Sequence, residues 1–325
     1  MHDRQADADD NKYFPTEIFR GFGASKMLFS QTAIAEGAQS RTVILSHINL
    51  LVIGWMIKKI NPSIRLIMFA HGIEIWDKMG RFRRRMLDSC DIIFSVSNFT
   101  CEKIKEVHSI AGEKCKVLNN CLDPYLPLPS HPEKSERLLK KYWFEKNDPV
   151  LFTLTRLASS ERYKGYDKVL EALVEIRKPY PNIRYLLAGS YDADEKKHLD
   201  LLIEDFGLSA NVAIAGFVPD EELDEHFALA DIYVMPSMKE GFGIVFIEAM
   251  YYGLPVIAGN KDGSVDALCN GELGVLVDPD DVDSIRDAIE NILVNKKAYT
   301  PDRELLMERF SYDTYKRKLE ELLVR

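Results

Sequence analysis

The stretch KEGFGIVFIEAM, residues 239–250, decides the predicted fold of the second half of the chain. It follows a short apolar run at 231–237 that predicts a buried strand, and the Gly-Leu-Pro at 253–255 predicts a helix end. The predicted order is therefore a strand, a turn that contains glycine, and a helix that begins at about Ile244. This order points free backbone N–H groups and the positive end of a helix at whatever binds above the turn.

The turn itself carries two glycines and two carboxylates that suit a ligand with phosphate and sugar groups. Gly241 and Gly243 let the backbone approach a ligand closely, because no Cβ stands in the way. Glu240 lies in the turn and Glu248 lies about one turn into the helix. A phosphate bound at the helix end would have one carboxylate on either side, and each could accept hydrogen bonds from hydroxyl groups.

Around this stretch, apolar strands alternate with helices from residue 150 to residue 294, and a shorter series of the same kind fills residues 42–96. Such alternation predicts an α/β fold with parallel sheets covered on both faces, which bind ligands at the carboxyl ends of the strands. A segment rich in proline and charge at 124–149 predicts the connection between two domains, residues 1–145 and 146–310. Residues 1–12 are expected to form a loosely held tail.

Composition narrows the class of protein. A chain of 325 residues suggests two domains, and a net charge of −9 disfavours nucleic acid as a partner. The five cysteines form no close pairs, which predicts reduced thiols in a cytoplasmic protein and no zinc site. No apolar run approaches the ~20 residues of a membrane span, and the polar, acidic first ten residues do not resemble a signal peptide.

The pattern E-G-F-G-x4-E-A-M, followed by G-L-P-V-I-A, resembles the signature of retaining glycosyltransferases of the GT4 type, the sucrose-synthase and mannosyltransferase group. The resemblance implies the GT-B fold, in which two Rossmann-like domains have parallel sheets that face a cleft. It further implies that a C-terminal helix at 311–325 packs back on the first domain. In such enzymes Glu248 would bind the nucleotide ribose, and Glu240 would lie by the hydroxyls of the donor sugar.

The resemblance also implies which other residues bind the donor. Arg156 and Lys164 match an R-L…K-G pair that contacts the donor diphosphate, and two permanent cations at strand and helix ends suit that role. The insert at 158–163 is longer than the family pattern, so Arg162 is an alternative to Lys164. The expected donor-binding residues are Arg156, Lys164, Gly216, Phe217, Val218, Gly241, Phe242, Gly243, Ile244 and Glu248.

His71 and Glu240 are the catalytic candidates. His71 follows a predicted strand in the pattern His-Gly-x-Glu and resembles the active-site histidine of the family, where it would orient hydroxyls or handle a proton. His47 and Asn49 follow the preceding strand and are weaker candidates for the same cleft.

Two further patterns have simpler interpretations. The D-x-D triplets at 192–194 and 7–9 match the metal–diphosphate site of the other glycosyltransferase fold, but the first is expected to begin a helix and the second lies in the tail. Neither metal nor other cofactor is expected. The basic run at 81–85 suits either a solvated helix face or contact with an anionic membrane.

The sequence differs from the family pattern at the start of the chain, because the first residues contain no apolar strand followed by a glycine-rich loop. We expect the first one or two βα units to be missing, or supplied by a partner chain.

The predicted function is transfer of a hexose from a GDP- or UDP-linked sugar to a glycan or lipid-linked acceptor, in cell-surface polysaccharide synthesis. Its expected place is the cytoplasm, and peripheral contact with the inner face of the membrane is a further expectation. The alternatives are a partner-dependent subunit without activity of its own and a nucleotide-sugar epimerase. A dinucleotide oxidoreductase is disfavoured, since no G-x-G-x-x-G follows a strand.

Overall fold

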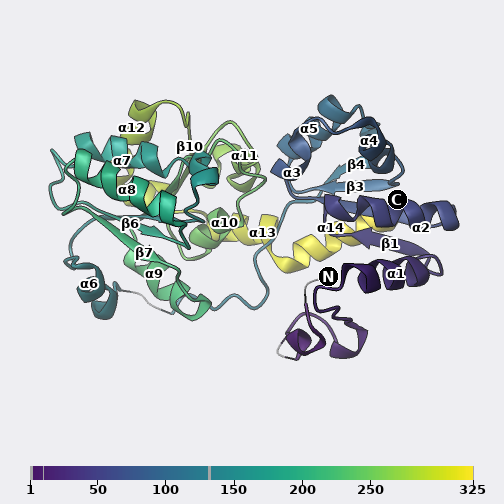
Figure 1. The fold of residues 1–325 in the computed structure, drawn as a ribbon. Coiled ribbons are helices and arrows are strands. Elements are labelled where there is room, and N and C mark those ends of the chain that lie inside the picture. Colours follow the sequence, from purple (N-terminus) through teal and green to yellow (C-terminus); the bar gives the residue numbers. More distant parts are fainter. Residues whose placement is uncertain (1–2, 10, 131–132, 325) are drawn as a thin grey trace. The chain divides into compact units, whose positions relative to one another are not determined.

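The computed structural model describes residues 3–9, 11–130 and 133–324 (Figure 1). The chain divides into two compact units, residues 1–95 with 101–116 and residues 96–100 with 117–325. Each unit contains one parallel sheet, with four strands in the first and six in the second. The predicted α/β class, with two parallel-sheet units, is confirmed.

The sheet of the first unit has the strand order β1-β2-β3-β4. Its elements are α1 (Lys26–Gly37), β1 (Thr42–Leu45), α2 (Leu51–Ile60), β2 (Arg65–Ala70), α3 (Ile73–Trp76), α4 (Arg81–Asp88), β3 (Ile92–Ser95), α5 (Asn98–His108) and β4 (Cys115–Val117).

The sheet of the second unit has the strand order β10-β9-β8-β5-β6-β7. Its strands are β5 (Val150–Leu154), β6 (Arg184–Ala188), β7 (Val212–Gly216), β8 (Ile232–Met235), β9 (Val256–Gly259) and β10 (Val275–Val277). Its helices are α6 (Glu136–Tyr142), α7 (Tyr166–Ile176), α8 (Ala193–Asp205), α9 (Leu223–Leu229), α10 (Ile244–Tyr251), α11 (Ser264–Ala267), α12 (Val282–Val294), α13 (Arg303–Phe310) and α14 (Tyr312–Val324).

Alternating side chains of the second sheet enter two separate cores. Val150 and Phe152 of β5 pack with residues of α9, α10 and α13, whereas Leu151 packs on the other face with residues of α7, α8 and α12. Figure 1 shows the sheet between these two helical layers. The inner strands β8 and β9 are buried on both faces and are continuous apolar runs, as in covered parallel sheets, whereas the edge strands β7 and β10 are only partly buried.

The strand order places a topological switch point between β5 and β8. From β5 the chain continues to β6 and β7 on one side, and then returns to β8, β9 and β10 on the other. The connections that leave the carboxyl ends of β5 and β8 therefore diverge to opposite sides of the sheet. In open parallel sheets this divergence forms the crevice in which ligands bind.

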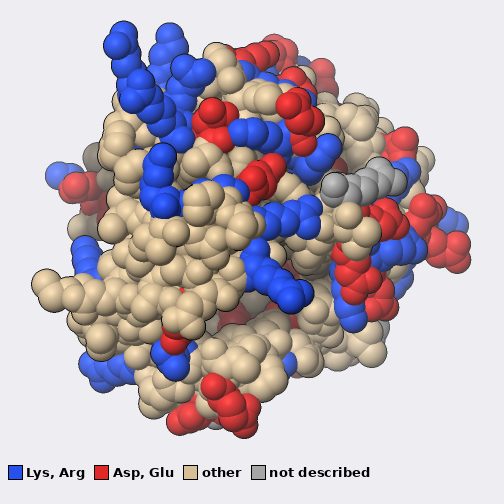
Figure 2. Space-filling view, turned by 90° about the vertical axis from the view of Figure 1, so that its right-hand side faces the viewer, with Lys and Arg blue, Asp and Glu red and all other residues tan. Residues whose placement is uncertain are grey.

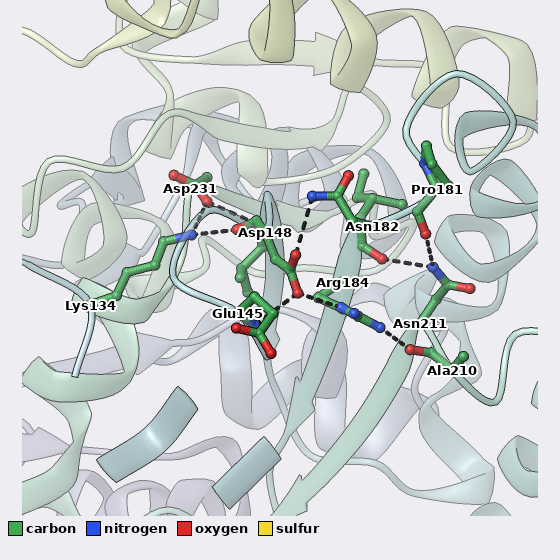
Figure 3. Close-up of polar contacts among 11 residues, drawn as sticks. Lys134, Glu145, Asp148, Pro181, Asn182, Arg184, Ala210, Asn211 and Asp231 are labelled. Atoms are coloured by element: carbon green, nitrogen blue, oxygen red, sulfur yellow. Dashed lines mark hydrogen bonds and ion pairs between the residues drawn. The ribbon is translucent and has the colours of Figure 1, made fainter. Parts of the chain in front are cut away.

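A polar network closes the opposite, amino-terminal end of the same sheet (Figure 3). Asp231, just before β8, accepts hydrogen bonds from Lys134 Nζ at 2.6 Å and from the Val150 amide at 2.9 Å. Asp148, before β5, accepts from Arg184 Nε at 2.7 Å, and its carbonyl oxygen accepts from Lys134 Nζ at 2.6 Å. The network ties the segment before α6 to the first residues of β5, β6 and β8.

Most predicted strands and helices are confirmed, but the connecting segment at 124–149 is not irregular throughout. It contains α6, whose Leu138, Leu139 and Tyr142 are buried in the core of the second unit. The prediction also missed α13, which ends at Phe310. Ser311 separates it from α14, and the Ser311 hydroxyl accepts the Thr314 amide at 3.3 Å.

The expectation of a loosely held tail is wrong for residues 3–9. The Asp3 carbonyl oxygen accepts hydrogen bonds from the amides of Phe22 and Gly23, both at 2.8 Å, and Ala8 is fully buried. A Cβ at Gly21 would lie 2.2 Å from the Arg4 carbonyl carbon, so the tail packs directly on this glycine.

None of the helices in the described ranges is both long and apolar enough to cross a membrane.

Candidate functional site

The turn between β8 and α10 is held in place by residues that follow β9. The Glu240 amide donates to Asp262 Oδ2 at 2.6 Å, and the Gly263 amide donates to the Glu240 carbonyl oxygen at 2.8 Å. A Cβ on Gly263 would lie 2.0 Å from the Gly241 carbonyl oxygen, so the two turns approach too closely for any other residue. The backbone of Glu240 is therefore fixed by two hydrogen bonds.

Asp262 is not among the site residues predicted from the sequence, although its neighbourhood carries a recognisable signal. Asp-Gly-Ser follows the β9 run, and Asp262 Oδ1 accepts the Ser264 amide at 2.9 Å, which is an Asx turn. Burial raises the pKa of the Asp262 carboxyl to about 6, and the nearby Glu240 carboxylate contributes to the rise. The Asp262 side chain is buried, and its carboxyl accepts hydrogen bonds from backbone amides of the two turns rather than from solvent.

The amino end of α10 is open. Its N-cap is Gly243 at φ +85°, and no side chain caps the helix. Within residues 3–9, 11–130 and 133–324, no acceptor takes the amide hydrogens of Phe242 and Gly243. These amides and the helix end form a ready anion-binding position above the switch point.

Lys164 reaches this turn from the connection that follows β5. Its Nζ lies 2.5 Å from Glu240 Oε2, and the two side chains are only 13% and 16% exposed. The connection is docked by a hydrogen bond from the Met238 amide to the Tyr163 carbonyl oxygen at 2.9 Å. Gly165, at φ +79°, allows the close approach, since a Cβ there would lie 2.3 Å from the Pro236 carbonyl oxygen.

The alternative cation, Arg162, has a different partner. Its Nε lies 2.8 Å from Glu195 Oε2, and Glu195 is fully buried and also accepts the Tyr166 hydroxyl at 2.8 Å. The structure therefore brings Lys164, and not Arg162, to Glu240.

Arg156 directly follows the β5 region and is 72% exposed. Its Nε lies 3.2 Å from Glu161 Oε1. Burial raises the pKa of the Tyr163 hydroxyl; Glu161 and Glu240 raise it further and Arg156 lowers it, so all three charges lie near that ring. Arg156 thus belongs to the same cluster, with its ion pair made to Glu161.

Glu248 lies one turn into α10, and its carboxyl group has no hydrogen-bond or ion-pair partner among the residues that the structure describes. Burial raises the pKa of its carboxyl to about 7, with smaller contributions from the carboxylates of Asp123 and Asp220. A partly buried carboxyl without a donor is costly unless a ligand supplies one.

The predicted base-binding loop follows β7. Gly216 ends that strand at φ +72°, the Phe217 side chain is largely exposed, and Val218 is buried. The Gly189 amide donates to the Gly216 carbonyl oxygen at 2.8 Å. Gly189 is not among the predicted site residues. A Cβ there would lie 1.7 Å from the Thr155 carbonyl oxygen, so the loop after β6 crosses the end of β5.

His71 belongs to the first unit and follows β2. Its Nε2 lies 2.7 Å from the Ser46 carbonyl oxygen, and its ring stacks on His47 with centroids 6.4 Å apart. Because a carbonyl oxygen can only accept, Nε2 carries the hydrogen and a neutral ring has Nδ1 as its acceptor. Asn49 is engaged elsewhere, as its Oδ1 accepts from Arg83 Nη2 at 3.0 Å.

The D-x-D triplets have local structural roles. Asp192 caps α8 by accepting the Glu195 amide at 2.8 Å, and Asp7 accepts the Arg4 amide at 2.7 Å. In the described part of the chain, no three His, Cys, Asp or Glu side chains gather in a way that could hold a metal ion.

Comparison with known proteins adds an independent finding. A family model for glycosyl transferases group 1 matches residues 134–317. A GDP-mannose-dependent alpha-(1-6)-phosphatidylinositol monomannoside mannosyltransferase of Mycobacterium tuberculosis is 30% identical over 274 residues, with 80% of this chain and 69% of that protein covered. O-antigen chain mannosyltransferase B of Escherichia coli is 29% identical over 209 residues, with 64% and 52% covered.

Solved structures share the fold. A glycosyltransferase of Rickettsia africae matches with a TM-score of 0.78 at 21% identity, over 94% of this chain and 83% of that chain. The Anabaena protein Alr3699/HepE, in complex with UDP and glucose, matches with a TM-score of 0.76 at 20% identity, over 91% and 81%.

Proposed function

Because the chain belongs to the glycosyl transferases group 1 family, we propose that it is a retaining enzyme that moves a hexose from a nucleotide diphosphosugar to a glycan or lipid-linked acceptor. Family membership makes it a glycosyltransferase, and the two parallel-sheet units have the GT-B fold. The observation that carries the proposal is the contact of Lys164 with Glu240 beside the open amino end of α10, at the switch point of the sheet.

In this proposal the diphosphate binds at that helix end. The amides of Phe242, Gly243 and Ile244 donate to its oxygens, and Lys164 and Arg156 balance the negative charge that grows on the leaving group. Arg156 is available because an exposed ion pair such as its pair with Glu161 contributes only about 1 kcal/mol or less. Catalysis is then mainly electrostatic.

The remaining groups hold the two ends of the donor. The Glu248 carboxylate accepts hydrogen bonds from the ribose hydroxyls, which supplies the donors that its partly buried carboxyl lacks. The loop at Gly216, Phe217 and Val218 contacts the base, mainly through its backbone. Glu240 binds hydroxyls of the transferred sugar, and the Nδ1 atom of His71 is the proposed acceptor for a substrate hydroxyl proton.

The relatives suggest which substrates to test first. The mycobacterial relatives are GDP-mannose-dependent and act on phosphatidylinositol monomannoside, whereas the Anabaena structure holds UDP and glucose. We therefore place GDP-mannose first and UDP-glucose second as donors, and a lipid-linked glycan as acceptor. The proposed setting is the synthesis of cell-surface glycans in the cytoplasm, at the inner face of the membrane.

Replacement of either member of the central pair tests the proposal. Lys164→Ala and Glu240→Ala should each lower transfer from the preferred donor by about a hundredfold or more, because each removes a group that acts on the reacting sugar phosphate. Lys164→Ala should also weaken binding of the nucleotide diphosphate in calorimetry. The matched control is Lys168→Ala, which removes a half-exposed lysine of α7 paired with Glu171 and should retain activity.

Other outcomes identify other functions. Full activity of folded Glu240→Ala protein would refute the assignment. Donor binding without turnover, restored by a second chain, would indicate a partner-dependent subunit. One observation favours the partner-dependent subunit. Strand β1 is the edge of the first sheet and its Ile44 is exposed, so a strand of another chain could pair there. Conversion of a nucleotide sugar without any acceptor would indicate an epimerase.

A further inference from the structure

Helix α2 of the first unit is apolar on two opposite faces. One face is buried and consists of Leu51, Ile53, Gly54 and Ile57. The other contains Val52, Met56 and Ile60, which repeat at intervals of four residues and are 45%, 40% and 61% exposed. Lys58 and Lys59 are the charged residues of this helix, and an exposed apolar stripe of this kind normally lies against something other than water.

Helix α4 extends this exposed stripe with an aromatic contact. The ring of Phe82, which is 60% exposed, lies against the ring of Trp55 in α2, with centroids 5.4 Å apart and planes at 72°. The two rings line an open hollow together with Lys59 and Arg85. The ammonium of Lys59 lies 5.6 Å from the Trp55 ring centroid, so cations border the aromatic surface directly.

The charge on this surface is positive and partly unpaired. Arg81 and Arg85 are exposed and have no ion-pair partner within the described residues. The carboxylates nearby, Asp88 and Asp91, already pair with Lys114 at 3.1 Å and with Lys58 at 2.6 Å. Figure 2 shows Lys and Arg side chains gathered at the upper left of the face drawn, beside a broad area without charged side chains.

The other arginines of α4 are held locally. Arg83 Nη2 donates to Asn49 Oδ1 at 3.0 Å, and Arg84 Nε donates to the His108 carbonyl oxygen at 2.7 Å. The basic run at 81–85 therefore divides by structure into two arginines with local partners and two that are available to an external anion.

We propose that the α2–α4 face, made of Val52, Trp55, Met56, Arg81, Phe82 and Arg85, docks the protein on an anionic lipid surface. Aliphatic and aromatic side chains bordered by cations match the boundary between acyl chains and negatively charged headgroups. Nucleic acid would use the cations but gain nothing from the apolar stripe. A second copy in a two-fold dimer would bring two faces of the same positive charge together.

The test is co-sedimentation of the full chain with vesicles. We expect binding to vesicles of phosphatidylcholine with 30% phosphatidylglycerol, weak binding to pure phosphatidylcholine, and loss of most binding in 1 M NaCl, where the screening length is about 3 Å. Arg81→Glu with Arg85→Glu should lower the partition coefficient at least about tenfold, since each surface cation contributes appreciably near an anionic leaflet. Phe82→Ser should lower it severalfold at unchanged charge.

The matched control is Lys197→Glu with Lys297→Glu, which makes the same charge change at exposed positions of the second unit and should sediment like the parent protein. Circular dichroism verifies that each variant is folded. Equal binding to charged and neutral vesicles, or an equal loss in the control, would overturn the proposal. So would binding that survives Phe82→Ser unchanged, which would indicate a simple polyanion site. If the parent protein does not bind vesicles but forms dimers, and Phe82→Ser abolishes these dimers, the face binds a second copy of the chain.

Discussion

The carboxyl group of Glu248 lies in a strongly perturbed environment. Burial raises its pKa to about 7, and Asp123 and Asp220 add to the rise. The folded chain therefore holds this proton at pH values where the unfolded chain, with a carboxyl pKa of about 4.3, has lost it. The group does not oppose folding below about pH 4, and its cost grows as the pH rises towards 7.

We expect Glu248→Gln to stabilise the free protein by about 1 to 3 kcal/mol at pH 8, and to have little effect near pH 4.5. Urea unfolding at the two pH values measures this difference. In the parent protein, nucleotide affinity should increase from pH 6 to pH 8, because the ionised carboxyl is a stronger acceptor for the ribose hydroxyls than the protonated one. In Glu248→Gln it should be lower and nearly independent of pH. A parallel pH dependence in both proteins would remove Glu248 from the ribose site.

At the level of elements, the site depends on how closely the connection after β5 packs on the end of β8. Gly165 precedes α7 at φ +79°, and a Cβ there would meet the Pro236 carbonyl oxygen at 2.3 Å. The next residue back is Lys164, whose ammonium contacts Glu240. The position of the Lys164 ammonium therefore depends on Gly165. This glycine lies in the connection between β5 and α7, whereas the Glu240 turn lies between β8 and α10.

Gly165→Ala should destabilise the protein by about 2 to 4 kcal/mol, through backbone strain at positive φ and the clash with the strand end, and should weaken donor binding. Gly253→Ala is the matched control. Gly253 has φ +83°, but a Cβ there would meet nothing within 4 Å, so only the strain of about 1 to 2 kcal/mol is expected. Thermal unfolding and nucleotide calorimetry compare the two. Equal effects of both variants would contradict the close-packing explanation.

In the second unit, the two ends of the six-stranded sheet have different roles, one in binding and one in stability. The carboxyl ends of the strands carry the candidate site, and the amino ends carry the network of Asp148 and Asp231 (Figure 3). Burial alone would raise the pKa of Asp231, but Lys296 and Lys134 hold it below the usual value. Because the folded pKa is lowered, this stabilisation is present above about pH 4 and is lost as the pH falls through the folded pKa.

We expect Asp231→Asn to lower the free energy of unfolding by about 2 to 3 kcal/mol at pH 7, since it removes the carboxylate that pairs with Lys134 and Lys296. The difference from the parent protein should shrink towards pH 3, and donor affinity at 25 °C should not change. Asp200→Asn, which removes an exposed pair with Lys196 within α8, should cost less than about 1 kcal/mol. Loss of donor binding in Asp231→Asn would show that the two ends are coupled.

Most of the strands and helices, and the turn at Glu240, could be predicted from the sequence, because apolar period and glycine position are local properties of the chain; α6 and α13 could not. The sequence also named Lys164 and Glu240, but it could not choose between Lys164 and Arg162. Tertiary packing makes that choice, since it depends on Glu195 being buried beside Arg162 and on Gly165 packing against the end of β8. Asp262, Gly189 and the exposed stripe of α2 were likewise decided by packing, because each acquires its role from residues distant in the chain or from the absence of a covering element in the described fold.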